Sequence, residues 1–268
     1  MSYSAPERLL KSLGIDRPED IDLEAVAWSL GAKVKYRPLK SCEARICGYE
    51  NKAIISVDNR KIPQRQRFSV AHEIGHWIYH RGQLLICRAS DIGSFGGFRN
   101  GATSPEFVAD QFASELILPS YILTPILKQF RSLNLKTVSE ISAAFKASKT
   151  ATAIRLVQSN RFHAMLVCHA QQGRRWFIRP PCVPDRWFPQ DDLDRDSYAF
   201  DTLFGSRQEQ VRPRKIGADA WFDRAEANRY EIFEHTFPLP SDEVLTLLTF
   251  TDEDMMEERD TLRPFRRR

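Results

Sequence analysis

Three of the six histidines in this chain of 268 residues lie within a single short segment. The segment is RQRFSVAHEIGHWIYH, residues 65–80, and it contains His72, His76 and His80, with Glu73 next to the first of them. Residues four apart lie one above the other on a helix, so His72 and His76 can offer two imidazole nitrogens to one zinc ion. Glu73 would project beside the metal, where it can accept a proton from metal-bound water. This H-E-x-x-H arrangement predicts metal-assisted hydrolysis of a peptide bond.

The neighbours of the histidine pair favour a metal over a structural role. A five-residue pattern arises by chance, and two histidines on a helix are more often structural. Here Ile74 and Gly75 carry no charge, Gly75 permits a second backbone to approach closely, and apolar residues line the opposite face. His80 lies about 12 Å from His72 along the axis, too far to share the ion easily. Two interpretations of His80 stay open: it contacts a ligand or the substrate, or it is a helix-end histidine interacting with the C-terminal dipole.

A catalytic zinc also needs a third protein ligand and one open position. The third histidine of metzincins is absent, because Tyr79 and Gly82 stand where the glycine and that histidine would be. The segment PEFVADQFASELILP, residues 105–119, instead places Glu106 and Asp110 on one helix face with small alanines. We predict Glu106 as the third ligand and Asp110 as the carboxylate that orients a ligating histidine. The alternative is an ordinary solvated acidic face. Zinc is the expected ion, and another divalent ion such as Mn²⁺ would suit the same donors.

These two segments resemble those of a known family. RFSVAHEIGHWIYH followed by EFVADQFASELILP is similar to the ImmA/IrrE metallopeptidases, which show A-H-E-x-G-H and then E-x-x-A-[ND]-x-F-A-x-x-L-x-x-P. The resemblance covers residues 50–130 most strongly. It implies a zincin-like fold with zinc on His72, His76 and Glu106, and with Glu73 as general base. It further implies cleavage of helix-turn-helix repressors, and a last domain that resembles a GAF-type sensor.

The elements that would hold these residues predict an α+β protein. Helices are predicted at residues 6–13, 23–30, 63–79, 105–119 and 120–130, with two more between 135 and 159, and strands at 33–38, 44–50, 52–58, 161–170, 174–180 and 243–250. We expect a zinc metallopeptidase domain with a small sheet and the active-site helix at 1–130. A helical segment like a helix-turn-helix would follow at 131–160. A mixed α/β domain, regulatory or sensory, would complete the chain at 161–268.

The helical pair between 135 and 159 matches a helix-turn-helix in outline. Its second helix carries Lys149 and Arg155, but it has no arginine cluster and no well-placed Asn or Gln to read bases. A helical wall beside the zinc domain is therefore favoured, and DNA binding is not.

Composition restricts the remaining classes. Hydrophobic residues at 42% and charged residues at 28% are globular values, and a net charge of +4 is too weak to argue for nucleic-acid binding. No run of 18 apolar residues exists and the N-terminus has no signal-peptide core, so we expect a cytoplasmic protein with no membrane contact. The five scattered cysteines are expected to be free thiols, with none near the zinc site. A glycine-rich loop at 90–105 is a candidate lid, and 252–260 is expected to be an exposed acidic stretch.

Three hypotheses follow. The first is an endopeptidase that cuts a helix-turn-helix repressor. The second is a non-catalytic regulatory factor that binds DNA or protein and holds a structural metal, and the third is a toxin or antitoxin component with the same site. The complete set of histidines and glutamates favours catalysis, because a structural zinc would normally be closed by a fourth protein ligand. The oligomeric state stays open. The candidates for stabilising the oxyanion are Tyr79, His80, His163, His169 and His235.

Overall fold

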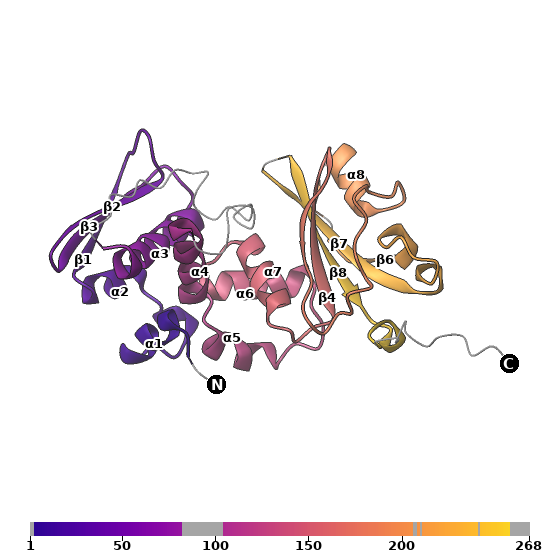
Figure 1. Cartoon of the computed structure of the whole chain (residues 1–268), viewed down its shortest axis with the longest axis horizontal. Coiled ribbons are helices and arrows are strands. Elements are labelled where there is room, and N and C mark those ends of the chain that lie inside the picture. Colours follow the sequence, from indigo (N-terminus) through magenta and orange to yellow (C-terminus); the bar gives the residue numbers. More distant parts are fainter. Residues whose placement is uncertain (1–2, 82–103, 206–207, 210, 241, 258–268) are drawn as a thin grey trace. The chain divides into compact units, whose positions relative to one another are not determined.

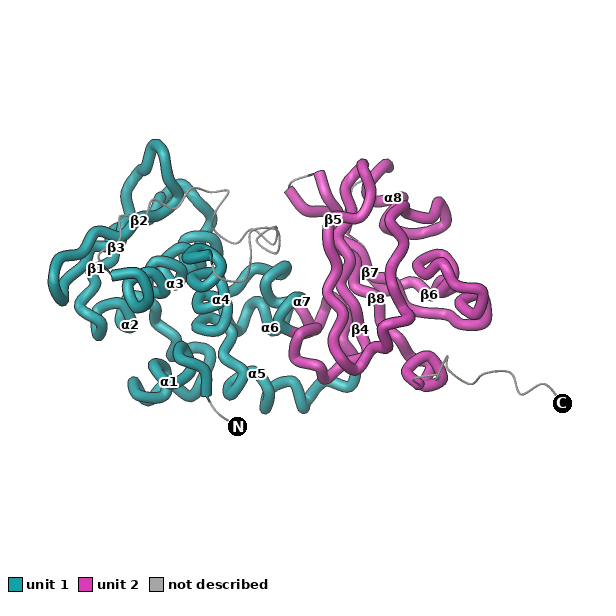
Figure 2. Tube along the Cα trace, in the orientation of Figure 1, with its two compact units in different colours: residues 1–131, 139–155 teal, residues 132–138, 156–268 magenta. Residues whose placement is uncertain are grey.

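The chain folds into two compact units (Figure 2). The computed structural model describes residues 3–81, 104–205, 208–209, 211–240 and 242–257. Unit 1 comprises residues 1–131 and 139–155, and unit 2 comprises residues 132–138 and 156–268. Residues 131–160, predicted as a separate helical segment, are thus shared between the units. The α+β class is as predicted.

Unit 1 begins with two short helices and a three-stranded sheet. Helix α1 spans Ala5–Ser12 and α2 spans Leu23–Ser29, and Asp22 caps α2 through the backbone amides of its first turn. The strands are β1 (Ala32–Arg37), β2 (Ala44–Tyr49) and β3 (Lys52–Asp58). Their order is β1-β3-β2, with β1 parallel and β2 antiparallel to the central β3.

The long helix α3, Pro63–Tyr79, packs on this sheet (Figure 1). Trp77 is buried and lies over β2 at Gly48, where an added Cβ would meet its ring at 2.3 Å. The indole nitrogen of Trp77 donates to the carbonyl of Leu30 at the end of α2, at 2.9 Å. The sheet and α2 thereby fix one side of the helix that carries the histidines.

Four more helices follow. They are α4 (Pro105–Ile117), α5 (Ser120–Leu127), α6 (Leu135–Phe145) and α7 (Lys149–Gln158). Ser104 caps α4, and the buried carboxylate of Glu7 accepts hydrogen bonds from the first amides of α5. Arg155 of α7 donates to the carbonyl of Leu118 at 3.2 Å and to the hydroxyl of Ser120 at 2.9 Å. This arginine therefore anchors α7 to the end of α4, which agrees with the predicted helical wall.

Unit 2 is built on a five-stranded antiparallel sheet of order β5-β4-β8-β7-β6. The strands are β4 (Ala164–Ala170), β5 (Gly173–Ile178), β6 (Arg214–Gly217), β7 (Glu231–Leu239) and β8 (Glu243–Phe250). Helix α8, Tyr198–Phe204, and the short turns η3 (Ala218–Ala220) and η4 (Ala227–Arg229) complete the unit with the core side chains Trp187, Trp221 and Phe222.

Strand β7 and helix α8 were not predicted from the sequence. Strand β7 carries the polar residues Glu234 and His235, which are not typical of a buried strand. Both side chains are nevertheless buried. The carboxylate of Glu234 accepts the backbone amide of Ala199 in α8 at 2.7 Å, and the ring of His235 accepts the amide of Leu135 at 3.3 Å. Burial of these polar groups is tolerated because each has a hydrogen-bond partner.

The acidic stretch expected at residues 252–260 is exposed at Glu253, Asp254 and Glu257, but it contains one buried side chain. Met255, in the short turn η5 (Glu253–Met255), is fully buried, and its carbonyl accepts the indole N–H of Trp187 at 2.6 Å. The guanidinium of Arg186 donates to the carbonyls of Asp254 and Met255. The acidic residues around Met255 gave no indication in the sequence that its side chain is buried.

Other sequence expectations can be checked only in the described part of the chain. Cys42, Cys47, Cys168 and Cys182 are free thiols there, as predicted. No helix among the described residues is both long and apolar enough to cross a bilayer. The candidate lid at 90–105 lies almost entirely outside the described residues.

Candidate metal centre

Helices α3 and α4 pack against each other without side chains between them at one point. A Cβ added to Gly75 would lie 3.1 Å from the Cα and 3.3 Å from the carbonyl oxygen of Ala109. The close approach predicted for Gly75 and the α4 alanines is therefore confirmed. It makes the whole circumference of α3 buried from Ser69 to Trp77, including its polar face. Only a short helix separation lets a carboxylate of α4 reach the histidines.

Three donor atoms converge between the helices. The Nε2 atoms of His72 and His76 lie 2.9 Å apart. The Oε2 atom of Glu106 lies 3.0 Å from the first nitrogen and 3.5 Å from the second. Both histidines are buried, whereas the side chain of Glu106 is 31% exposed. The structure thus brings together the three residues expected to hold the metal.

The chemistry of the donor set fits a divalent cation. A carboxylate only accepts hydrogen bonds, so the 2.8 Å contact with Asp110 places a proton on Nδ1 of His72 and leaves a lone pair on its Nε2. Three acceptor atoms then face one another within 3.5 Å. Donors around a tetrahedral zinc lie about 3.3 Å apart, which is close to the observed spacing. The cluster needs a proton or a cation at its centre.

The pKa values of the cluster also favour a positive charge at its centre. Burial lowers the pKa of His72, but its hydrogen bonds with Asp110 and Glu106 outweigh burial and raise the pKa to about 9. Burial raises the pKa of Glu106, and its contacts with His72 and His76 outweigh that effect and bring the pKa to about 2. The carboxylates therefore favour positive charge on the imidazole, and a bound metal ion would replace that proton.

His80 lies beside the second histidine. Its Nδ1 is 3.1 Å from Nδ1 of His76, so one ring donates a proton to the other. Burial, and then the nearby His76, lower the pKa of His80, which favours its neutral, hydrogen-bond-accepting form. Of the two interpretations left open, contact with a candidate ligand is the one that the geometry supports.

Glu73 is fully buried on α3, next to His72. Burial raises the pKa of the Cys42 thiol, Arg45 opposes this effect, and the negative charge of Glu73 adds to it. Glu43 lies in the loop between β1 and β2. The guanidinium of Arg65 binds its buried carboxylate through two contacts of 2.8 and 2.7 Å, which hold this loop at the start of α3. A pairing across 22 residues leaves no local signal in the sequence.

The candidates for oxyanion stabilisation separate by their surroundings. His169 is buried in unit 2, where its Nε2 contacts the carbonyl of Gln190 at 3.3 Å, and His235 accepts the amide of Leu135. Both have structural roles. His163 is exposed on unit 2. Tyr79 is exposed at the end of α3 with its ring against Phe112. Tyr79 and His80 are the candidates carried by unit 1.

Fold and donor set together define the class of domain to which unit 1 corresponds: an α+β domain with an H-E-x-x-H helix and a glutamate on the next helix. Residues 27–157 match the family described as the IrrE N-terminal-like domain, Peptidase_M78. The resemblance inferred from the two motifs is confirmed.

Two individual proteins illustrate the similarity. The chain is 33% identical over 76 residues to the uncharacterized protein YqaB of Bacillus subtilis (strain 168), a match that covers 28% of this chain and 42% of that protein. The chain therefore matches less than half the length of this relative. A Mycobacterium tuberculosis transcriptional regulator of known structure has a TM-score of 0.57 at 12% identity, covering 92% of this chain and 75% of that one. This likeness concerns the fold alone.

Proposed function

We propose that the chain is a zinc-dependent endopeptidase that hydrolyses a peptide bond in a helix-turn-helix transcriptional repressor. The observation that carries the proposal is the convergence of His72 Nε2, His76 Nε2 and Glu106 Oε2 beside the buried Glu73. The match of residues 27–157 to the Peptidase_M78 family supports peptidase chemistry. The peptidase part would be residues 1–130, and residues 161–268 would regulate it.

The chain's own residues have distinct tasks in this mechanism. His72, His76 and Glu106 would hold the ion, which supplies Lewis-acid activation when bound. Glu73 accepts a proton from the attacking water and delivers it to the leaving amine. Asp110 holds the ring of His72 with Nε2 directed at the other donors, through the 2.8 Å contact at Nδ1. His80 supports His76 in the same way.

A repressor substrate is supported by the resemblance of the two motifs to the ImmA/IrrE family, which implies cleavage of helix-turn-helix proteins. Direct DNA reading by this chain is not supported, because Arg155, the main basic residue of the second helix of the pair, is engaged with Leu118 and Ser120.

The decisive experiment separates metal binding from catalysis. Purified protein is expected to bind one zinc per chain by elemental analysis. It should also cut candidate helix-turn-helix repressors from the same genome, with mass spectrometry locating the bond. Glu73→Gln should keep the metal and lower the cleavage rate by about 10²-fold or more, because it removes the general base.

Glu19→Gln is the matched control, since Glu19 is a solvent-exposed carboxylate of unit 1 and this change should leave cleavage unaltered. Wild-type cleavage by Glu73→Gln would reject the mechanism. A metal-loaded protein that cuts no repressor but binds DNA with a strong salt dependence would favour the regulatory alternative.

A further inference from the structure

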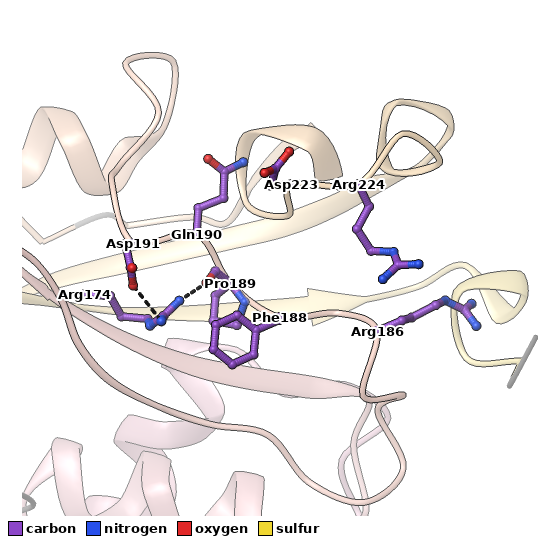
Figure 3. A pocket seen from close by; sticks show the side chains of 8 residues that line it. All are labelled: Arg174, Arg186, Phe188, Pro189, Gln190, Asp191, Asp223 and Arg224. Atoms are coloured by element: carbon purple, nitrogen blue, oxygen red, sulfur yellow. Dashed lines mark hydrogen bonds and ion pairs between the residues drawn. The ribbon is translucent and has the colours of Figure 1, made fainter. Parts of the chain in front are cut away.

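Unit 2 contains a pocket that the proposed peptidase chemistry does not use. It has a volume of about 250 Å³ and lies between residues 186–191 and residues 223–224 (Figure 3). Pockets for drug-sized ligands are usually about 300–1,000 Å³, so this one suits a smaller molecule.

Two of the three arginines in the wall are engaged in the structure. The side chain of Arg174 is 12% exposed and contacts the carboxylate of Asp191 at 2.6 Å. Arg186 is equally buried, donates to backbone carbonyls near residue 255, and lies 3.4 Å from the carboxylate of Glu226. These guanidinium groups build the pocket and have their charges matched.

The remaining charged groups in the wall are one cation and one anion. Arg224 approaches Glu226 through Nε at 3.4 Å, while its two terminal nitrogens make no hydrogen bond or ion pair with the residues that the structure describes. Asp223 likewise has no such partner within the described chain. In Figure 3, Arg224 extends toward Arg186, and the Asp223 carboxylate points toward the Gln190 side chain.

The charges balance only when the residue behind the pocket wall is included. Three guanidinium groups (Arg174, Arg186 and Arg224) and two carboxylates (Asp191 and Asp223) line the pocket, and Glu226, outside the lining, contacts both Arg186 and Arg224. A phosphate or another simple anion would meet Asp223 as a like charge, and a simple cation would meet Arg224. A ligand with one positive and one negative group leaves neither charge uncompensated.

An exposed aromatic ring supplies the apolar part of the pocket. Phe188 is 57% exposed, yet its ring is held by Arg174, whose guanidinium lies 4.6 Å from the ring centroid, and by the edge of Phe177 at 5.0 Å. The adjacent Gln190 is also fixed: its amide nitrogen donates to the carbonyl of Asp219 at 2.8 Å, which leaves the side-chain oxygen as an acceptor. A wall ordered before binding lowers the entropic cost of holding a ligand.

We propose that this pocket binds a free α-amino acid with an apolar, preferably aromatic, side chain. The ligand carboxylate would lie against the terminal nitrogens of Arg224, its ammonium group against Asp223, and its side chain against the ring of Phe188. The site is independent of the metal centre, so the two proposals can fail separately.

Calorimetric titration of the full chain with L-phenylalanine tests the proposal, with fluorescence of the neighbouring Trp187 and Trp221 as a second readout. Saturable binding of one molecule per chain is expected. N-acetyl-L-phenylalanine, L-phenylalaninamide and L-alanine lack the ammonium, the carboxylate and the ring respectively. Each should bind at least about tenfold more weakly, a difference of about 1.4 kcal/mol. Equal binding of the acetylated compound, or no saturation by L-phenylalanine up to about 10 mM, would overturn the proposal.

Two variants assign the binding to this pocket. Asp223→Asn and Arg224→Gln change solvent-exposed side chains, so both should fold, and each should weaken L-phenylalanine binding by about tenfold or more. Arg229→Gln makes the same chemical change at an exposed arginine outside the pocket and should alter binding by less than about twofold. Circular dichroism checks the fold. Unchanged binding by both pocket variants would overturn the assignment.

Discussion

The proton positions on His72 and His76 decide whether their inner nitrogens can bind a cation. Asp110 accepts from Nδ1 of His72, and His80 contacts Nδ1 of His76, so each outer contact leaves Nε2 facing the centre. Asp110 also adds negative charge next to His72, on the side of the ring away from the other donors. Its contribution can be separated from that of ring orientation by a substitution that preserves shape.

Asp110→Asn is that substitution. The asparagine oxygen can still accept the proton on Nδ1 of His72, but the negative charge is lost, so zinc affinity should fall by about 10- to 100-fold. Competition with a chromogenic chelator measures the affinity. Asp16→Asn, at an exposed aspartate of unit 1, is the control and should have no effect. An unaltered affinity in Asp110→Asn would show that the charge of Asp110 does not act through His72.

His169 predicts a pH dependence of stability in unit 2. Burial lowers its pKa to about 4, below the ordinary value of 6.5 expected for the unfolded chain. The unfolded state therefore binds more protons between these values, and stability rises with pH. The contribution of His169 is fully present above pH 6.5 and is lost as pH falls toward 4, with a total of roughly 3 kcal/mol at most.

Urea unfolding followed by tryptophan fluorescence at several pH values measures this dependence. Burial raises the pKa of Glu234, which acts in the opposite sense, so the difference between wild type and His169→Gln isolates the histidine. The glutamine amide can still donate to the carbonyl of Gln190, which His169 contacts in the wild type. Parallel pH curves for the two proteins would contradict the prediction.

At the level of elements, the separation of α3 and α4 determines whether the cluster can form. Gly75 and the backbone of Ala109 leave no room for a methyl group. Gly75→Ala should push the helices apart by a few tenths of an ångström, destabilise the protein by about 1–3 kcal/mol, and weaken zinc binding because Glu106 moves away from the histidines. Thermal unfolding and chelator competition measure the two effects. Gln64→Ala, at an exposed position of α3, should show neither. Intact zinc affinity in Gly75→Ala would mean that the helix separation does not control the site.

At the level of the molecule, the division into two units predicts that zinc acts on one of them. All the proposed ligands lie in unit 1, and a ligand stabilises the part of the protein that binds it. Calorimetry should show two transitions, of which only one rises with zinc, by the equivalent of about 2.7 kcal/mol at 100 times the dissociation constant. Fluorescence assigns them, because Trp77 belongs to unit 1 and Trp187 and Trp221 belong to unit 2. A single transition, or equal shifts of both, would contradict the prediction.

Local patterns were sufficient to predict α2, α3, α4 and the first three strands. These elements depend on residues only a few positions apart, such as helix caps, Gly and Pro positions, and the spacing of His72 and His76. Such short-range effects can be recognised in a single sequence. The assignment of Glu106 and Asp110 to one face of α4 followed from helical periodicity in the same way.

Other features depended on segments that meet only in the folded chain. Three contacts each join residues distant in sequence: Glu106 with the histidines, Arg65 with Glu43, and Glu234 with the first turn of α8. Their partners are chosen by the packing of helices and strands, which no local pattern contains. The sequence by itself therefore determined which residues could do chemistry, and the tertiary structure decided which of them meet.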